Sequence, residues 1–202
     1  MKNLKSKGIK SIMLTMIIVL LCLCLARGSF ACSSITLNVP MYYKDGCNLW
    51  CWNASAQMIL SYHGSGYSQY TIANWAILDD ETCRVNWLYG CGHDADDDNV
   101  FKYGIDYILD HFGGLDSGRC SSALTSEACS YQLNEDMPFL IRWDQSPDPG
   151  HIIVCRGILC GIGGPWLYIN DSKAGAGQYL QTYGWVCSGG GHTWTHTLDY
   201  IH

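Results

Sequence analysis

The segment Asn48-Leu-Trp-Cys-Trp-Asn-Ala-Ser-Ala-Gln-Met58 places Cys51 at the beginning of a predicted helix, between Trp50 and Trp52. A cysteine acts as a nucleophile in its thiolate form, and a helix N-terminus stabilises the thiolate because aligned amide dipoles point at the sulfur. The backbone N–H of the same residue can donate to a carbonyl oxygen under attack. Cys51 is therefore our candidate nucleophile. The alternative is that Cys51 is a half-cystine.

A histidine and an acid that could activate this thiol lie in the second half of the chain. Gly150-His151-Ile-Ile-Val places His151 at the beginning of a predicted strand, and a second strand ends at Asn170-Asp171. If the two strands pair antiparallel, the Asp171 carboxylate can hold the imidazole in the tautomer that faces the thiol. Asn170 takes this role if the register points it inward instead. The alternative for His151 is a buried histidine without a catalytic role.

The elements that must position these residues change character along the chain. Apolar residues at helical spacing, with caps and glycine stops, predict helices in the first half, over 51–62, 68–78, 99–112 and 122–133. Short runs rich in β-branched and aromatic residues predict strands at 138–143, 151–156, 166–169, 179–186 and 193–201. Helices followed by strands favour an α+β fold, in which a helical half packs on an antiparallel sheet and a site lies in the cleft between them.

The N-terminus has the pattern of a secretory signal. Four lysines precede an apolar run over residues 12–26, and Ser29-Phe-Ala31 offers small residues for cleavage. We expect residues 1–31 to be removed and residues 32–202 to form a single domain, secreted to the extracellular space or the periplasm. An uncleaved anchor helix and a lipidated Cys32 are the alternatives.

Ten cysteines remain after residue 31, which in an exported chain predicts a disulfide framework. Zinc is not expected, because the sequence contains no CxxC pair. If Cys51 is a free nucleophile, one further cysteine must stay unpaired, and we expect this to be Cys32. Cys83–Cys91 and Cys120–Cys129 are candidate short-loop bridges, although connectivity cannot be derived from sequence.

Removal of residues 1–31 would leave seven basic residues against 18 acidic ones, a net charge of −11. Such an acidic chain is a poor partner for nucleic acid or anionic membrane surfaces.

The residues quoted above carry a family resemblance. Val39-Pro-Met-Tyr and the stretch from Asn48 to Gly64 resemble the nucleophile helix of the compact bacterial papain-like cysteine peptidases, a group that includes secreted effectors of plant pathogens. The segments Asn134–Trp143, Gly150-His151 and Asn170-Asp171 are similar to the histidine and acid strands of that family. The resemblance implies a papain-like fold and hydrolysis of peptide bonds through a thioester, with Cys51, His151 and Asp171 as the catalytic triad.

The resemblance has one departure. Papain-like enzymes carry a Gln five or six residues before the nucleophile, where this chain has Asp45 and Gly46. We expect Asn48 to complete the oxyanion hole with the Cys51 backbone N–H, and Trp50 and Trp52 to line the cleft. The resemblance further implies a protein or peptide substrate, no cofactor and no bound metal, and we expect a monomer.

Two other functions fit the same residues. One is a related thiol amidase or acyltransferase acting on cell-wall peptides or isopeptide bonds, which would share the triad. The other is a catalytically silent, disulfide-stapled binding module in which Cys51 is bridged to another cysteine. Product analysis separates the first from a peptidase, and disulfide mapping identifies the second.

Overall fold

An antiparallel sheet and the helices packed on it make up the computed structural model, which describes residues 32–45, 50–76, 104–145 and 148–202. Residues 32–202 form one compact unit, whereas the predicted signal segment lies outside the described residues. The cut after residue 31 therefore stays a prediction. In the described part of the chain, no helix is long and apolar enough to cross a membrane.

The described strands form an eight-stranded sheet with the order β2-β8-β3-β4-β5-β6, and β1 pairs with β4 while β7 pairs with β8. All the pairings are antiparallel. The strands are β1 (Ile35–Thr36), β2 (Gly118–Cys120), β3 (Phe139–Gln145), β4 (Asp148–Leu159), β5 (Trp166–Asp171), β6 (Gly177–Thr182), β7 (Ser188–Gly189) and β8 (His192–Asp199).

The central strand β4 contacts three neighbours, and a glycine makes this possible. The register between β4 and β5 shifts at Cys155/Gly157, where β1 also approaches. A Cβ atom on Gly157 would lie 2.6 Å from the backbone oxygen of Ile35, so a larger residue would push β1 away.

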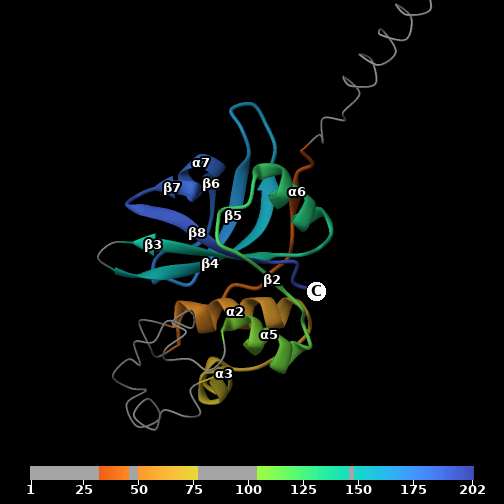
Figure 1. Cartoon of the computed structure of the whole chain (residues 1–202), viewed down its shortest axis with the longest axis vertical. Coiled ribbons are helices and arrows are strands. Elements are labelled where there is room, and N and C mark those ends of the chain that lie inside the picture. The colour runs from red at the N-terminus through yellow and green to blue at the C-terminus, as the bar shows by residue number, and fades with distance from the viewer. Residues whose placement is uncertain (1–31, 46–49, 77–103, 146–147) are drawn as a thin grey trace, which may run out of the picture. The chain divides into compact units, whose positions relative to one another are not determined.

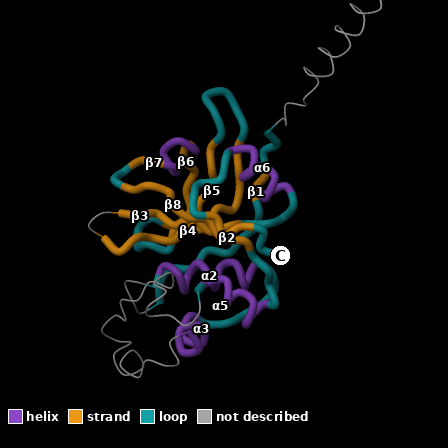
Figure 2. Tube along the Cα trace, viewed as in Figure 1, coloured by secondary structure: helices purple, strands orange, loops and turns teal. Residues whose placement is uncertain are grey.

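The described helices are α2 (Cys51–Tyr62), α3 (Gln69–Ala76), α5 (Ile105–Gly113), α6 (Ser126–Asn134) and α7 (Tyr183–Cys187). Figure 1 shows α2, α3 and α5 gathered on one side of the sheet, with α6 and α7 on the other. Figure 2 likewise shows α2, α3 and α5 gathered on one side of the strands. The predicted α+β architecture, a helical half packed on an antiparallel sheet, is confirmed.

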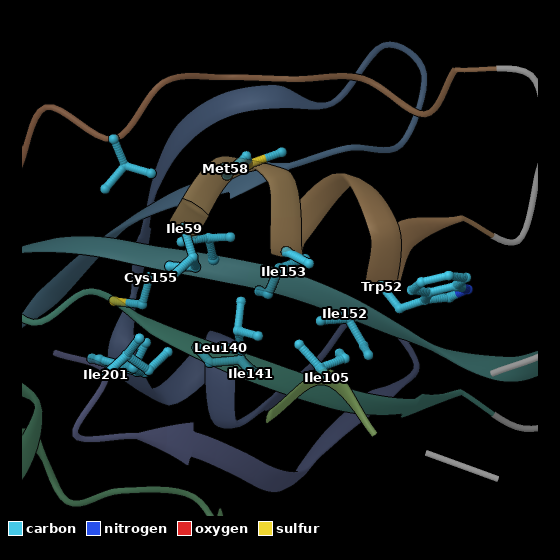
Figure 3. Close-up of a cluster of buried hydrophobic side chains, with 14 of the residues drawn as sticks. Trp52, Met58, Ile59, Ile105, Leu140, Ile141, Ile152, Ile153, Cys155 and Ile201 are labelled. Atoms are coloured by element: carbon cyan, nitrogen blue, oxygen red, sulfur yellow. The ribbon is translucent and has the colours of Figure 1, made fainter. Parts of the chain in front are cut away.

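Apolar side chains of α2 and of the two central strands form the core beside the helical layer. Figure 3 shows Met58 and Ile59 of α2 over side chains of β3 and β4, with Ile105 of α5 nearby. Met58, Ile59, Ile141 and Ile153 are fully buried. This packing fixes α2, and therefore its first residue, against the strand that carries His151.

The helix expected over 99–112 is found from Ile105, after the extended backbone of Gly104, and side-chain caps correct two further element predictions. The helix expected from residue 122 begins at Ser126, because the Thr125 hydroxyl accepts a hydrogen bond from the backbone N–H of Ala128 and caps it there. The strand expected over 179–186 ends at Thr182, whose hydroxyl accepts from the N–H of Trp185 and begins α7. In both places a side-chain cap decides the boundary.

The disulfide prediction for Cys32 is wrong. Cys32 and Cys160 form a disulfide across a sequence separation of 128 residues, because β1 pairs with the end of β4 and brings the two cysteines together. Cys120 and Cys129 are free thiols, so the proposed bridge between them is also wrong. The Cys83–Cys91 pair lies outside the described residues.

Candidate active site

Cys51 occupies the first residue of α2, as predicted. The helix forms here because residues 51–62 carry apolar side chains on its buried face, and the backbone oxygen of Trp50 accepts the first helical bond from the N–H of Ala54 at 2.9 Å. The Cys51 thiol is not part of a disulfide; it is partly exposed and hydrogen-bonded to the His151 side chain. A reduced thiol in this position argues against the binding-module alternative, which required Cys51 in a disulfide.

His151 and Asp171 meet across neighbouring antiparallel strands. β4 and β5 are paired in the register Val154↔Asn170, which brings the end of β5 beside the beginning of β4. The distance between His151 Nε2 and Asp171 Oδ1 is 2.6 Å, and both side chains are buried. Since Nε2 is engaged by the carboxylate, Nδ1 is the ring nitrogen left to face the thiol.

The two partners of His151 favour its charged form. Burial lowers the pKa of His151, but the hydrogen bonds to Asp171 and to Cys51 and the charges of both groups outweigh burial and raise it to about 9. Burial alone would raise the pKa of Asp171, whereas the hydrogen bond and the charge of His151 hold it below its ordinary value. The arrangement therefore favours an imidazolium held between a carboxylate and a sulfur.

The Asp171 carboxylate is itself held in place. Its Oδ1 accepts a hydrogen bond from the backbone N–H of Lys173 at 2.8 Å. Tyr179 of β6 lies near this carboxylate, and burial followed by the charge of Asp171 raises the pKa of that phenol. A hydrogen-bonded, buried carboxylate keeps one orientation, so the imidazole does as well.

Asn170 does not take the orienting role. Its Nδ2 donates to the backbone oxygens of Val39 and Pro40 at 3.2 and 3.3 Å, and its Oδ1 accepts from Gln178 Nε2 at 3.0 Å. Alternation along β5 therefore directs Asp171, and not its neighbour, towards His151.

Trp143, which lies outside the predicted triad, packs beside His151 and carries a second histidine. Trp143 is the β3 register partner of His151, its ring centroid lies 6.2 Å from the imidazole, and its Nε1 donates to the Val186 backbone oxygen at 2.9 Å. The indole also stacks on His192, with 3.8 Å between ring centroids. Burial lowers the pKa of His192, so this ring favours the neutral form beside the imidazolium.

A buried glutamine anchors the chain just before the nucleophile. Gln69 of α3 is 3% exposed; its Oε1 accepts from the Asp45 N–H at 2.9 Å, and its Nε2 donates to the Tyr43 backbone oxygen at 2.7 Å. Its backbone oxygen accepts from Asn53 Nδ2 at 2.8 Å, on α2 itself. The sequence carries no signal for this role of Gln69, because the contact joins segments that only the fold brings together.

Trp50 and Trp52, expected in the cleft wall, are core residues with an exposure of 1% each. Asn48, expected in the oxyanion hole, lies outside the described residues. Over the ranges that the structure describes, no cluster of three His, Cys, Asp or Glu side chains is arranged to hold a metal ion.

Comparison with known proteins gives the family. Residues 33–183 match the family described as papain-like cysteine protease AvrRpt2, which confirms the predicted resemblance. No protein with a curated description matches the chain.

Two solved structures are similar to this chain. One, described as a C39-like peptidase from Bacillus anthracis, has a TM-score of 0.55 and 12% identity, and the match covers 84% of this chain and 98% of that one. At that identity the likeness shows the fold. The other is a double glycine motif protease from an AMS/PCAT transporter in complex with its leader peptide, with a TM-score of 0.48, 17% identity and coverage of 87% and 95%. The family match extends over most of the described residues, and the chain belongs to the papain-like cysteine proteases of the AvrRpt2 family.

Proposed function

We propose that this peptidase is exported and hydrolyses peptide bonds through a thioester on Cys51, with His151 as base and acid and Asp171 as orienter. One observation carries the proposal. The thiol at the N-terminus of α2 is hydrogen-bonded to an imidazole whose Nε2 lies 2.6 Å from a buried carboxylate. Acyl transfer by a thiol requires a nucleophile hydrogen-bonded to a base, and a base hydrogen-bonded in turn to a group that orients it.

The reaction proceeds in two stages. The Cys51 thiolate forms a bond to the carbonyl carbon, and the backbone N–H of Cys51 donates to the developing oxyanion. His151 then gives its Nδ1 proton to the leaving amine as the C–N bond breaks. In the second stage His151 takes a proton from water, the water oxygen attacks the thioester carbon, and the C–S bond breaks. This chemistry uses groups of the chain and water only.

Export is proposed on two grounds. The N-terminal lysines, the apolar run and the small residues before residue 32 have the order of a secretory signal. The Cys32–Cys160 disulfide is of a kind that persists in oxidising compartments. The extracellular space and the periplasm both meet that condition.

Labelling of the exported protein with a thiol-directed epoxide, followed by peptide mapping, tests the proposal. We expect the label on Cys51 and not on the other free thiols of the described chain, Cys120, Cys129, Cys155 and Cys187. His151→Ala should abolish it, whereas His202→Ala, which removes an exposed histidine near the C-terminus, should leave it unchanged. Incubation with an unfolded protein such as casein then shows whether new amino termini appear.

Each result has a separate meaning. Labelling together with cleavage of casein supports the peptidase. Labelling without cleavage, but with transfer or release of an amine from cell-wall peptides, supports the amidase or acyltransferase alternative. Absence of labelling, with Cys51 recovered in a disulfide, contradicts the proposal.

A further inference from the structure

A row of rings lies on the face of the sheet that carries the proposed catalytic histidine. Trp143 of β3 is opposite His151 of β4, and on β8 it is opposite Trp194. His192 is two residues before Trp194, so it shares this face and lies diagonal to Trp143. Its imidazole stacks on the indole, with 3.8 Å between ring centroids and 19° between the planes. His192 is 5% exposed, and the proposed reaction makes no use of it.

A break in the register brings His192 to this face. The register of β3 with β8 shifts by one residue just before Trp143, which therefore pairs with Trp194 instead of Thr195. With regular pairing, the side chains of Trp194 and His192 would point to the other face of the sheet, away from Trp143. A β-bulge of this kind redirects side chains, and such bulges are common beside active sites.

The end of α7 holds both rings of the stack. Backbone oxygens in the last turn of a helix have no partner within the helix. Two of them accept from the stacked rings: Trp185 O from His192 Nε2 at 3.0 Å, and Val186 O from Trp143 Nε1 at 2.9 Å. The Trp185 ring stands edge-on to both, at 76° to the imidazole and 83° to the indole. Hydrogen bonds therefore fix the stacked pair against α7.

The glycines of the turn between β7 and β8 allow this arrangement. A Cβ atom on Gly189 would lie 2.5 Å from Cδ1 of Trp185, so any other residue would displace that ring. Gly190 and Gly191 have φ angles of 56° and 85°, in the region that favours glycine. The three glycines let the chain turn tightly beside Trp185 and return at His192 to the stack.

His151 lies where the strand pairing gives it little support. The regular pairing of β3 with β4 ends at Trp143↔His151, and the register shifts at Gln145 beyond it. The His151 side chain is nevertheless only 9% exposed, with the Trp143 ring centroid 6.2 Å from the imidazole. An indole that turned away would expose the bond between His151 Nε2 and Asp171 Oδ1 to water. A fixed indole keeps that bond buried, where it is stronger.

We propose that His192 is a positioning residue for the catalytic histidine and acts through Trp143. The inference rests on the proposed peptidase function. The stacked ring and its bond to Trp185 hold the indole in one orientation, and the indole keeps His151 aligned with the other two members of the triad. A neutral imidazole suits this task, because a charged one would repel the imidazolium of His151. Burial and the charge of His151 both lower the pKa of His192.

Labelling of Cys51 by the thiol-directed epoxide measures this alignment. In His192→Ala the maximal rate of labelling at pH 7 should fall roughly 10- to 100-fold, as it does when catalytic groups are slightly displaced. The epoxide concentration that gives half of that rate should change by less than about twofold, because binding is not affected. His192→Gln keeps a donor for Trp185 but has no ring, and should be nearly as slow. His192→Phe restores a flat ring and should be within about threefold of wild type.

Two readouts separate positioning from stability. In His192→Ala the alkaline limb of the labelling profile should move from about pH 9 towards 6.5, by about half a unit or more, because water weakens the ion pair. A loss of stability alone would leave this limb in place. In Trp143→Leu, which has already lost the indole, adding His192→Ala should slow labelling by less than about twofold more.

A matched control is a histidine stacked on a tryptophan elsewhere. His111 of α5 lies on Trp75 of α3 with 4.1 Å between ring centroids and 13° between the planes. His111→Ala should leave the labelling rate and the alkaline limb unchanged. The thermal midpoint shows whether each variant is folded, and His192→Gln replaces His192→Ala if the latter is not.

The outcomes separate the two proposals. Wild-type rate and alkaline limb in a folded His192→Ala or His192→Gln overturn the positioning role and leave the peptidase standing. A His192→Phe variant as slow as His192→Ala also overturns it, because the stacked ring would then not be the cause. A wild-type protein that is not labelled at Cys51 overturns the proposed function and this inference together.

Discussion

Replacing Asp171 by Asn tests the electrostatic core of the site, because it removes one charge and retains the shape. The carboxylate is the first partner that raises the pKa of His151 to about 9 against the effect of burial. A hydrogen bond between buried charged groups is worth roughly 1.5–3 kcal/mol, or about 1–2 pKa units at 1.36 kcal/mol per unit. We therefore expect the pKa of His151 to fall to about 7–8 in Asp171→Asn.

The rate of epoxide labelling at Cys51 between pH 5 and pH 10 measures this shift. At pH 9 about half of the wild-type imidazole is protonated if its pKa is about 9, against about 1–10% in the variant. Labelling of Asp171→Asn at pH 9 should therefore be about 5- to 50-fold slower, whereas at pH 6 the two rates should agree within a few fold.

A matched control is available on α5. Asp110→Asn removes an exposed carboxylate and should leave the alkaline limb of the labelling profile unchanged. If Asp171→Asn also leaves that limb within half a pH unit of wild type, the carboxylate does not hold the imidazolium, and the orienting role is refuted.

Three further predictions concern stability. The pKa of His151 is above its ordinary 6.5, so protonation of this ring stabilises the folded state fully below pH 6.5, and that stabilisation is lost as pH rises through about 9. The free energy of unfolding, measured in urea at pH 6 and pH 10, should therefore fall by up to roughly 3 kcal/mol in wild type and by less in Asp171→Asn. The disulfide can be removed by Cys32→Ser, by Cys160→Ser or by both changes together, and because all three variants lose the same bridge, each should lower the thermal midpoint by the same amount, about 5–15 °C. Unequal effects would mean that one of the cysteines contributes to stability in a way other than through the disulfide. Gln69→Leu leaves the Asp45 N–H and the Tyr43 backbone oxygen, both upstream of the nucleophile, without their side-chain partner. We expect the free energy of unfolding to fall by about 2–4 kcal/mol and the labelling of Cys51 to be slower. Gln69→Glu keeps the acceptor for Asp45 and should give values between those of wild type and Gln69→Leu.

Local signals were sufficient for the nucleophile helix. The interval from Cys51 to Tyr62 was predicted to the residue, since apolar spacing and the following Gly64 mark both its face and its end. The meeting of His151 with Asp171 followed from the order of two strands and one turn between them, which is a short-range inference. Elements joined by short connections could be read from the sequence in this way.

Long-range contacts could not be predicted in the same way. The Cys32–Cys160 bridge, the stacking of His192 on Trp143 and the anchoring of the upstream chain by Gln69 each depend on which strands and helices become neighbours. The end of β6 was missed for a different reason. Aromatic and β-branched residues favour a strand there, but the Thr182 cap begins a helix.

The Cys32–Cys160 bridge also determines what a peptidase of this kind becomes after it is cut. The bridge closes a covalent ring that contains both Cys51 and His151, while Asp171 lies outside it. A single cleavage between residues 32 and 160, by another protease or by a second copy of this one, adds one water and releases no fragment. A nicked molecule keeps its nucleophile and its base on the same covalent body, migrates as an intact chain without reductant, and separates into two pieces only when the disulfide is reduced.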